Sequence, residues 1–264
     1  MKRFIVLAAA ATSTLLAANG CSDSTSPPKP ASVVAFNTVR DTIVGRPVND
    51  SLAVKVTDSG GTPVSGITVT WAVTAGGGTV TPTTSVTNAS GIARTAWTLG
   101  QTPGANTVTA TVSGITPATF TVQSRFETFS ASLSGANEVP AKAVAGTGTA
   151  VYTLNATGDT VSYVVTVNGL TGPPSGAHLH FPADTTATAP VRVPLTITNL
   201  VVTGTIATGK FTASNIVNPT NPPGITPVNS IAELMALVRS GLVYTNVHTL
   251  LNPAGEIRGQ DRQP

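Results

Sequence analysis

Residues 51–74 read SLAVKVTDSGGTPVSGITVTWAVT, and this stretch decides the fold of the first half of the chain. Leu52, Val54 and Val56 alternate with other residues, and the run ITVTWAVT alternates in the same way after a segment rich in Gly, Pro and Ser. A period of two is typical of a strand with one buried face, and Gly and Pro punctuate turns. The stretch therefore predicts two strands joined by a dense turn.

Similar runs recur along the rest of the chain. Residues 32–124 continue with GIARTAWTLG, NTVTATVSG and ATFTVQ, and residues 126–262 contain TFSASLSG, GTAVYTLNA, TVSYVVTVNGL, GAHLHF, VRVPLTI and LVVTGTIAT. Regularly spaced strands with no helical period between them favour antiparallel sandwiches. We therefore expect an all-β protein made of two consecutive antiparallel β-sandwiches. Trp71 and Trp97 lie in alternating runs, so core packing is expected for them rather than ligand stacking.

One segment of the second half has a different period. In SIAELMALVRSG, Ser230 precedes Glu233 by three residues, which is the spacing of a capping box. Ile231, Leu234 and either Leu237 or Val238 form an apolar face at helical spacing, and Gly241 suits a helix end. This segment predicts one short helix packed on the second domain.

The composition limits the classes of partner. Charged residues make up 9% of the 264 residues, and the chain is rich in Val and Thr, so it is not a disordered sequence. The formal charge is +3, but Lys2 and Arg3 lie in a segment expected to be removed, which leaves twelve basic and eleven acidic residues. No basic run occurs, so nucleic acid is not expected as a partner.

The N-terminus predicts export. Residues 1–20 have a basic start, an apolar run and small residues, and Cys21 follows. The segment resembles a bacterial lipoprotein signal, which implies lipidation of Cys21, although Ala18 stands where that signal usually has Leu. The alternative is an ordinary secreted protein. Cys21 is the only cysteine, so no disulfide framework is possible. Residues 21–31 are polar and Pro-rich and predict a disordered tether.

Two family resemblances follow from longer motifs. VKVTDSGGTPVSGITVTWAVTAGGGTV and TNASGIARTAWTLGQTPGANTVTATVSG resemble bacterial Ig-like domains of the invasin and intimin type, which implies a stalk or spacer. SLSGANEVP, GLTGPPSGAHLHFP, SGLVYTNVHT and NPAGEIRGQ together resemble the CHRD domain, which implies a sandwich of Ig-like or superoxide-dismutase-like type. The CHRD resemblance implies no particular reaction.

The CHRD-like motifs contain every histidine of the chain. His178 and His180 are two residues apart and would point from one face of a strand, and His248 follows in YTNVHT. If the two strands are neighbours, three imidazoles can hold copper or zinc. Glu138 or Glu256 would then supply an oxygen ligand or a hydrogen bond to a ligating ring.

The alternative is a purely structural network. In that case the three histidines hydrogen-bond to Glu138, Glu256 and Arg258 and fix the strand register. The pattern also looks like the histidine strand of copper-zinc superoxide dismutases. Two departures argue against a dismutase: no histidines remain for a second metal, and the structural disulfide of those enzymes is impossible here.

Other catalytic motifs are missing from the sequence. It contains no Gly-x-Ser-x-Gly elbow and no Gly-rich phosphate loop that leads into a helix. We therefore expect a non-catalytic binding, adhesion or structural protein, anchored to the envelope through Cys21 and facing an unknown protein or glycan. Ser22 permits sorting to the outer membrane or cell surface. The alternative function is a copper- or zinc-binding metalloprotein with possible redox activity.

Overall fold

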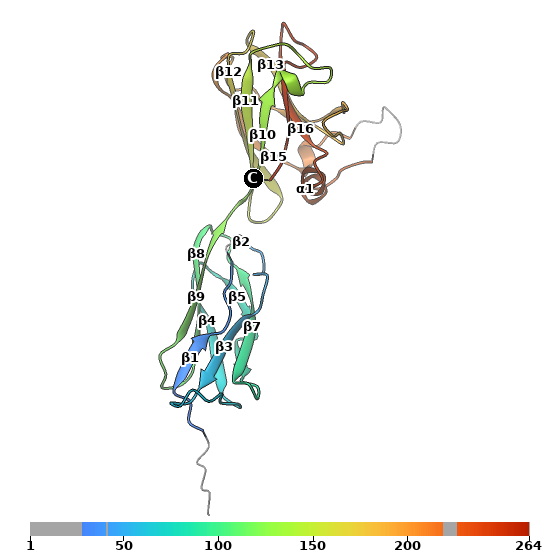
Figure 1. Ribbon diagram of the computed structural model, residues 1–264. Coiled ribbons are helices and arrows are strands. Elements are labelled where there is room, and N and C mark those ends of the chain that lie inside the picture. Colours follow the sequence, from blue (N-terminus) through green and yellow to red (C-terminus); the bar gives the residue numbers. More distant parts are fainter. Residues whose placement is uncertain (1–27, 41, 219–225, 264) are drawn as a thin grey trace, which may run out of the picture.

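The computed structural model describes residues 28–40, 42–218 and 226–263. Two β-domains are stacked end to end, and residue 126 joins them (Figure 1). The expected signal segment, Cys21 and most of the expected tether lie outside the described residues. None of the helices in the described ranges is long and apolar enough to cross a membrane.

The N-terminal domain is a sandwich of two sheets. Alternating side chains from both sheets fill its core, in which Trp71 and Trp97 are 2% and 1% exposed. The expected core role of both tryptophans is therefore confirmed. One sheet has the order β1 (Ser32–Ala35), β3 (Leu52–Thr57), β7 (Ile92–Leu99) and β5 (Gly78–Thr81), and the other has the order β2 (Thr42–Ile43), β9 (Ala118–Arg125), β8 (Gly104–Thr111), β4 (Thr68–Ala75) and β6 (Thr84–Val86).

The C-terminal domain contains one continuous eight-stranded sheet. Its order is β14 (Val191–Leu195), β13 (Pro174–His180), β16 (Tyr244–Thr249), β17 (Ile257–Gln260), β10 (Glu127–Ser134), β11 (Thr147–Leu154), β12 (Thr160–Asn168) and β15 (Gly204–Thr212). An antiparallel bridge between Ile197 and Ala207 links the segment after β14 to β15, so the two ends of the sheet meet. The sheet thus folds over on itself, and its two halves enclose a single core. The all-β prediction is confirmed.

The expected helix is α1 (Ile231–Arg239). The Ser230 hydroxyl accepts a hydrogen bond from the Glu233 backbone N–H at 3.2 Å, and the Glu233 carboxylate accepts one from the backbone of Asn229. The buried face of α1 consists of Ile231, Leu234, Met235 and Val238. The sequence left Leu237 or Val238 open as the last apolar residue of this face, and Val238 is the one buried more deeply. The expected strand at 200–208 begins later, at Gly204, and two short 3₁₀ turns complete the domain, η1 (Gly135–Asn137) and η2 (Ala213–Asn215).

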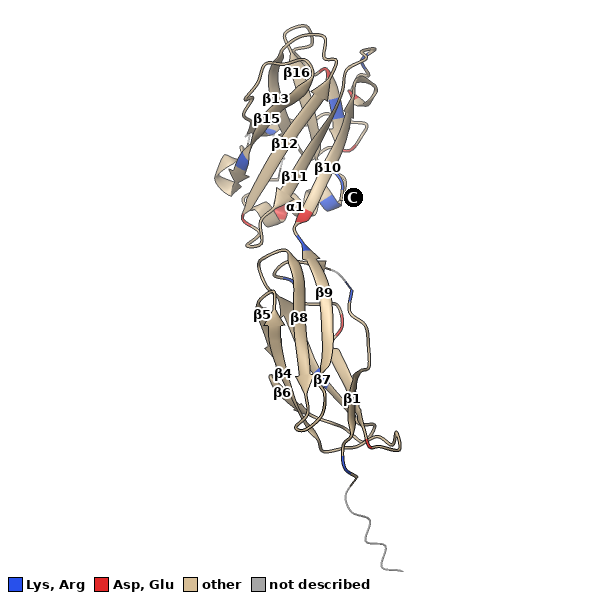
Figure 2. Ribbon diagram, turned by 90° about the vertical axis from the view of Figure 1, so that its left-hand side faces the viewer, with Lys and Arg blue, Asp and Glu red and all other residues tan. Residues whose placement is uncertain are grey.

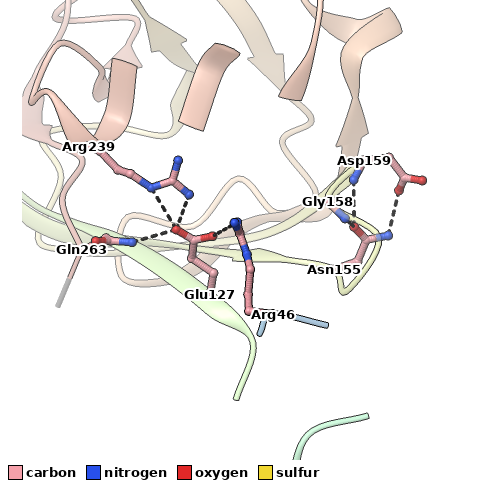
Figure 3. Close-up of polar contacts among 7 residues, drawn as sticks. All are labelled: Arg46, Glu127, Asn155, Gly158, Asp159, Arg239 and Gln263. Carbon is pink, nitrogen blue, oxygen red and sulfur yellow. Dashed lines mark hydrogen bonds and ion pairs between the residues drawn. The ribbon is translucent and has the colours of Figure 1, made fainter. Parts of the chain in front are cut away.

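A single buried carboxylate ties the two domains together. Glu127, the first residue of β10, lies 3.6 Å from the Arg46 guanidinium of the N-terminal domain. Its Oε1 also accepts hydrogen bonds from Arg239 of α1 and, at 2.7 Å, from Gln263 (Figure 3). Charged residues are sparse elsewhere, and blue and red segments meet at this junction in Figure 2. One acid therefore connects β10, the helix, the C-terminus and the preceding domain.

Replacing Glu127 with Gln should loosen the junction. The substitution keeps the shape of the side chain but removes the charge that attracts Arg46 and Arg239. Because both arginines are partly exposed, we expect a loss of only about 1 kcal/mol in the free energy of unfolding. Small-angle X-ray scattering should show a broader distribution of interdomain distances. The exposed Glu233→Gln serves as the control and should leave the distribution unchanged. If Glu127→Gln also leaves it unchanged, the junction does not depend on this charge.

Candidate functional site

The three histidines meet on adjacent strands of the C-terminal domain. β13 and β16 pair antiparallel, with Gly176 opposite His248 and His178 opposite Asn246 (Figure 1). His178 and His180 point from the same face of β13 because they are two residues apart. The neighbouring Ala177 and Leu179 point into the core. The sequence predicted that His248 can join the other two rings if its strand is the neighbour of β13, and the two strands are paired.

The imidazoles form a compact group. The His178 ring centroid lies 4.8 Å from that of His248 and 5.7 Å from that of His180. One nitrogen from each ring can be chosen so that all three lie within 4.8 Å of one another. Copper and zinc bind imidazole nitrogen at about 2.0–2.1 Å, so ligand atoms on one tetrahedral ion are about 3.4 Å apart. A closure of roughly 1.5 Å, within the reach of side-chain rotation, would bring the three nitrogens onto one ion.

A glycine makes room for this group. A Cβ atom on Gly176 would lie 2.9 Å from Cε1 and 3.3 Å from Nε2 of the His178 ring. Both distances are shorter than ordinary contacts, so the His178 ring would have to shift from this position if residue 176 carried a side chain. Gly176 also stands opposite His248, which leaves space for that ring between the strands.

Backbone carbonyls orient two of the rings. Nδ1 of His180 donates to the Ala189 carbonyl at 2.8 Å, and Nδ1 of His248 donates to the Pro253 carbonyl at 3.0 Å. Nε2 of each ring lies 3.0 Å from the side-chain oxygen of Asn246. Both rings therefore turn their Nε2 atoms toward the same point between β13 and β16.

His178 differs from the other two rings. Its Nδ1 is buried and has no hydrogen-bond partner within the described residues. Burial, reinforced by His248 and then His180, lowers the pKa of His178 from 6.5 to about 4. Burial also lowers the pKa of His180 and of His248. At neutral pH the site thus presents uncharged imidazoles, one of which has a buried nitrogen that lacks a partner. Metal ions require this neutral form.

An aromatic ring separates the histidines from a buried arginine. The His180 ring stacks on Tyr244 with centroids 4.7 Å apart and planes 3° from parallel. The Arg258 guanidinium lies 3.5 Å from the Tyr244 ring centroid and donates to the Asp184 carbonyl at 2.6 Å. Since β13 and β17 flank β16, the stack crosses three neighbouring strands. Cation–π contact and stacking hold this row of side chains on one face of the sheet.

Glu138 lies on the other side of that arginine. Glu138 and Arg258 both line a polar cavity of about 430 Å³ beside β10 and β17. One Glu138 oxygen and one Arg258 nitrogen are buried there without a hydrogen-bond partner within the described residues. Burial raises the pKa of Glu138 to about 7, although Arg258 and Lys142 oppose the shift. Neither Glu138 nor Arg258 hydrogen-bonds to a histidine.

Glu256 belongs to a different network. Its carboxylate accepts hydrogen bonds from the backbone and hydroxyl of Thr171, from the Thr249 hydroxyl and from the Asn252 amide. These hydrogen bonds join the loop before β13 to the loop after β16. Despite the cost of burial, they lower the pKa of Glu256. Glu256 thus fixes the loops next to His248 without contacting an imidazole.

Sequence reasoning overlooked Tyr244 and Asn246. Both stand in the run YTNVHT, in which Tyr244, Asn246 and His248 follow one another at two-residue spacing, so strand periodicity places all three on one face. The signal was present, but only the histidine of this run was considered. The carbonyls of Ala189 and Pro253 left no comparable signal, because backbone groups carry no residue-type information.

The imidazoles should titrate at unusually low pH in metal-free protein. We expect the His178 ring to remain neutral at pH 6 and to take up a proton near pH 4, measured by NMR titration of its ring resonances. An unfolded imidazole binds its proton near pH 6.5. Between these pH values the unfolded state holds more protons, so acidification lowers the free energy of unfolding, on the order of 2 kcal/mol. Titration of all three rings near pH 6.5 would contradict this.

Glu138 should act in the opposite direction. Its carboxyl keeps a proton up to about pH 7 in the folded state, against 4.5 when unfolded. Stability from this group is therefore present at low pH and is lost as pH rises through 7. The difference in unfolding free energy between wild type and Glu138→Gln, measured from pH 4 to 8, isolates this contribution from that of the histidines.

The comparisons with known proteins agree on the domain order. Residues 48–126 match the family model described as bacterial Ig-like domain (group 1), and residues 129–260 match the CHRD domain. No curated protein gives a significant match.

Three solved structures illustrate the level of structural similarity. The D00-D0 domain of intimin is 16% identical with a TM-score of 0.31, and the match covers 39% of this chain and 51% of that one. FdeC, an Escherichia coli adhesin, is 19% identical with a TM-score of 0.30, covering 67% and 55%. The Yersinia pseudotuberculosis adhesin InvE is 16% identical with a TM-score of 0.27, covering 88% and 58%.

This chain therefore spans about half the length of the first two of these structures. Family membership rests on the two domain matches, which together cover most of residues 48–260. The chain belongs to the CHRD domain family and carries a bacterial Ig-like domain of group 1 in front of its CHRD domain.

Proposed function

We propose that this protein is an envelope-anchored, non-catalytic metal-binding protein. Its CHRD domain holds one copper or zinc ion on His178, His180 and His248, and its Ig-like domain is a spacer. The observation that carries this proposal is the convergence of three imidazole nitrogens within 4.8 Å of one another. Of the two functions that the sequence left open, this geometry favours the metalloprotein.

The donor set suits these metals. Imidazole nitrogen is a preferred ligand of both zinc and copper, whereas magnesium and calcium prefer oxygen. Burial keeps the rings neutral, so no proton has to be displaced from them at pH 7. The carbonyls that accept from Nδ1 fix two ring orientations, as hydrogen bonds to ligating histidines usually do.

The spacer role is supported by the arrangement of the chain. β1 begins at the end of the Ig-like domain that is remote from the CHRD domain (Figure 1). A lipid on Cys21 would therefore attach the protein at that end and hold the CHRD domain, with its three-histidine group, away from the membrane. An outer-membrane or surface location is part of the same proposal, because Ser22 after the cysteine permits such sorting.

Adhesion or surface architecture is the second candidate. Leu200, Leu250 and Leu251 are largely exposed on loops at the end of the CHRD domain away from the Ig-like domain. Exposed apolar clusters often mark protein contacts. An unidentified protein or glycan would be the partner in that case, and metal binding would not be required.

Metal analysis tests the main proposal. Full-length protein dialysed against micromolar zinc or copper should retain one ion per chain, measured by inductively coupled plasma mass spectrometry. His248→Ala should reduce the affinity at least about a hundredfold, because it removes a ligand. Asp58→Asn removes a carboxylate from the Ig-like domain and should leave binding unchanged. Wild-type protein that remains metal-free would exclude this function and leave adhesion as the candidate.

The anchor can be tested separately. Cys21→Ser should abolish labelling by radioactive palmitate and should move the protein from the membrane fraction to the soluble fraction of an envelope preparation. Acyl chains account for nearly all of the expected membrane affinity. Ser22→Ala keeps the cysteine and serves as the matched control. A membrane-bound Cys21→Ser protein would show that another segment provides the anchor.

A further inference from the structure

The side chain of Asn246 lies at the centre of the three-histidine group. It is 3% exposed, and its residue stands directly opposite His178 on β13. One terminal atom of its amide, the oxygen, lies 3.0 Å from Nε2 of both His180 and His248.

Counting hydrogens constrains this arrangement. The Ala189 and Pro253 carbonyls can only accept, so the hydrogen of each ring sits on Nδ1. A neutral imidazole has no second hydrogen, and its Nε2 is then an acceptor. The Asn246 oxygen is also an acceptor, so it can make no hydrogen bond with either Nε2 atom, although both lie 3.0 Å away.

The remaining possibility is that both rings are charged. Two imidazolium ions would then lie beside each other in a largely buried group, with ring centroids 6.4 Å apart. Within the described residues, the hydrogen-bond partners of the two rings are backbone carbonyls and the Asn246 amide, and none is a carboxylate. Like charges without a counter-ion in a poorly solvated position are strongly disfavoured.

A half-turn of the amide about its Cβ–Cγ bond removes the conflict. The two terminal groups of an asparagine amide have nearly the same size, so their hydrogen-bond partners decide the orientation. After the half-turn, the NH₂ group donates one hydrogen to each Nε2, and every polar atom of the two rings is paired. No other side chain has to move.

The same amide position suits a metal ligand. Atoms bound to one ion at about 2.1 Å are separated by roughly 3.0–3.4 Å. The terminal amide atom lies at such a distance from both Nε2 atoms. If an ion takes the place of the two hydrogens that the NH₂ group donates, a second half-turn of the amide would bring the Asn246 oxygen within bonding distance of that ion.

We propose that Asn246 is the fourth member of the metal site and that its amide has two orientations. In metal-free protein its NH₂ group donates one hydrogen bond to Nε2 of His180 and one to Nε2 of His248. When the ion binds, the amide rotates by half a turn and gives its oxygen to the ion. Only the second half of this inference, the binding of the Asn246 oxygen to an ion, rests on the proposed function.

The metal-free half is tested by NMR. A hydrogen bond from the Asn246 NH₂ group to an imidazole nitrogen produces a scalar coupling between two ¹⁵N nuclei, which an N–H···O bond cannot produce. We expect this coupling to both rings at pH 7, together with ¹⁵N shifts of an Nδ1–H tautomer. The signals should be missing in Asn246→Asp. Protonated Nε2 atoms and no such coupling would overturn this part of the proposal.

The metal-bound half is tested by affinity. At pH 8, where the imidazoles are neutral, Asn246→Leu removes the oxygen at similar volume and should weaken zinc binding at least about tenfold. Asn246→Asp supplies a stronger oxygen ligand and should tighten binding about tenfold or more. Asn199→Asp adds the same charge on an exposed loop and should have little effect.

The outcomes separate the two proposals. Asn246→Leu protein that binds zinc as tightly as wild type would overturn the ligand role of Asn246 but not the three-histidine site. Wild-type protein that binds no metal would overturn the proposed function and the ligand role with it. The ¹⁵N coupling in metal-free protein would still decide the orientation of the amide.

Discussion

The register between β13 and β16 is the constraint on which the candidate site depends. With His178 opposite Asn246 and Gly176 opposite His248, three imidazoles and one amide lie on the same face. Because side chains alternate, a slip of one residue would send one strand's polar groups into the core. The buried Ala177, Leu179 and Val247 on the opposite face make such a slip costly. Core packing and site assembly are therefore fixed by the same pairing.

The second domain shows how polar groups can be buried on a sheet face. Arg258, Tyr244 and His180 form one row of stacked side chains, and Glu256 ties the loops beside it. Each member has a hydrogen bond or a ring contact that offsets part of the cost of leaving water. The buried Nδ1 of His178, which lies beside this row and belongs to the proposed metal site, has no hydrogen-bond partner within the described residues.

Much of the fold could be predicted from local pattern. Alternation around Trp71 and the cap at Ser230 indicated a strand and a helix, because these signals depend only on neighbouring residues. The partners of the histidines could not be predicted in this way. His248 joins His178 only because strands far apart in sequence become neighbours, and nothing within either segment specifies that pairing. For the same reason Glu138 and Glu256 looked equivalent in the sequence, yet one lies in a cavity and the other in a loop network.

The close approach of the His178 ring to Gly176 has a consequence for recognising such sites elsewhere. The glycine opposite His248 matters for the geometry of the group, since a Cβ atom there would make the His178 ring shift. A diagnostic pattern should thus combine Gly-x-His-x-His on one strand with Tyr-x-Asn-x-His on its neighbour. Related chains that keep the three histidines but have a bulky residue at the glycine position would therefore hold their imidazoles in a different arrangement.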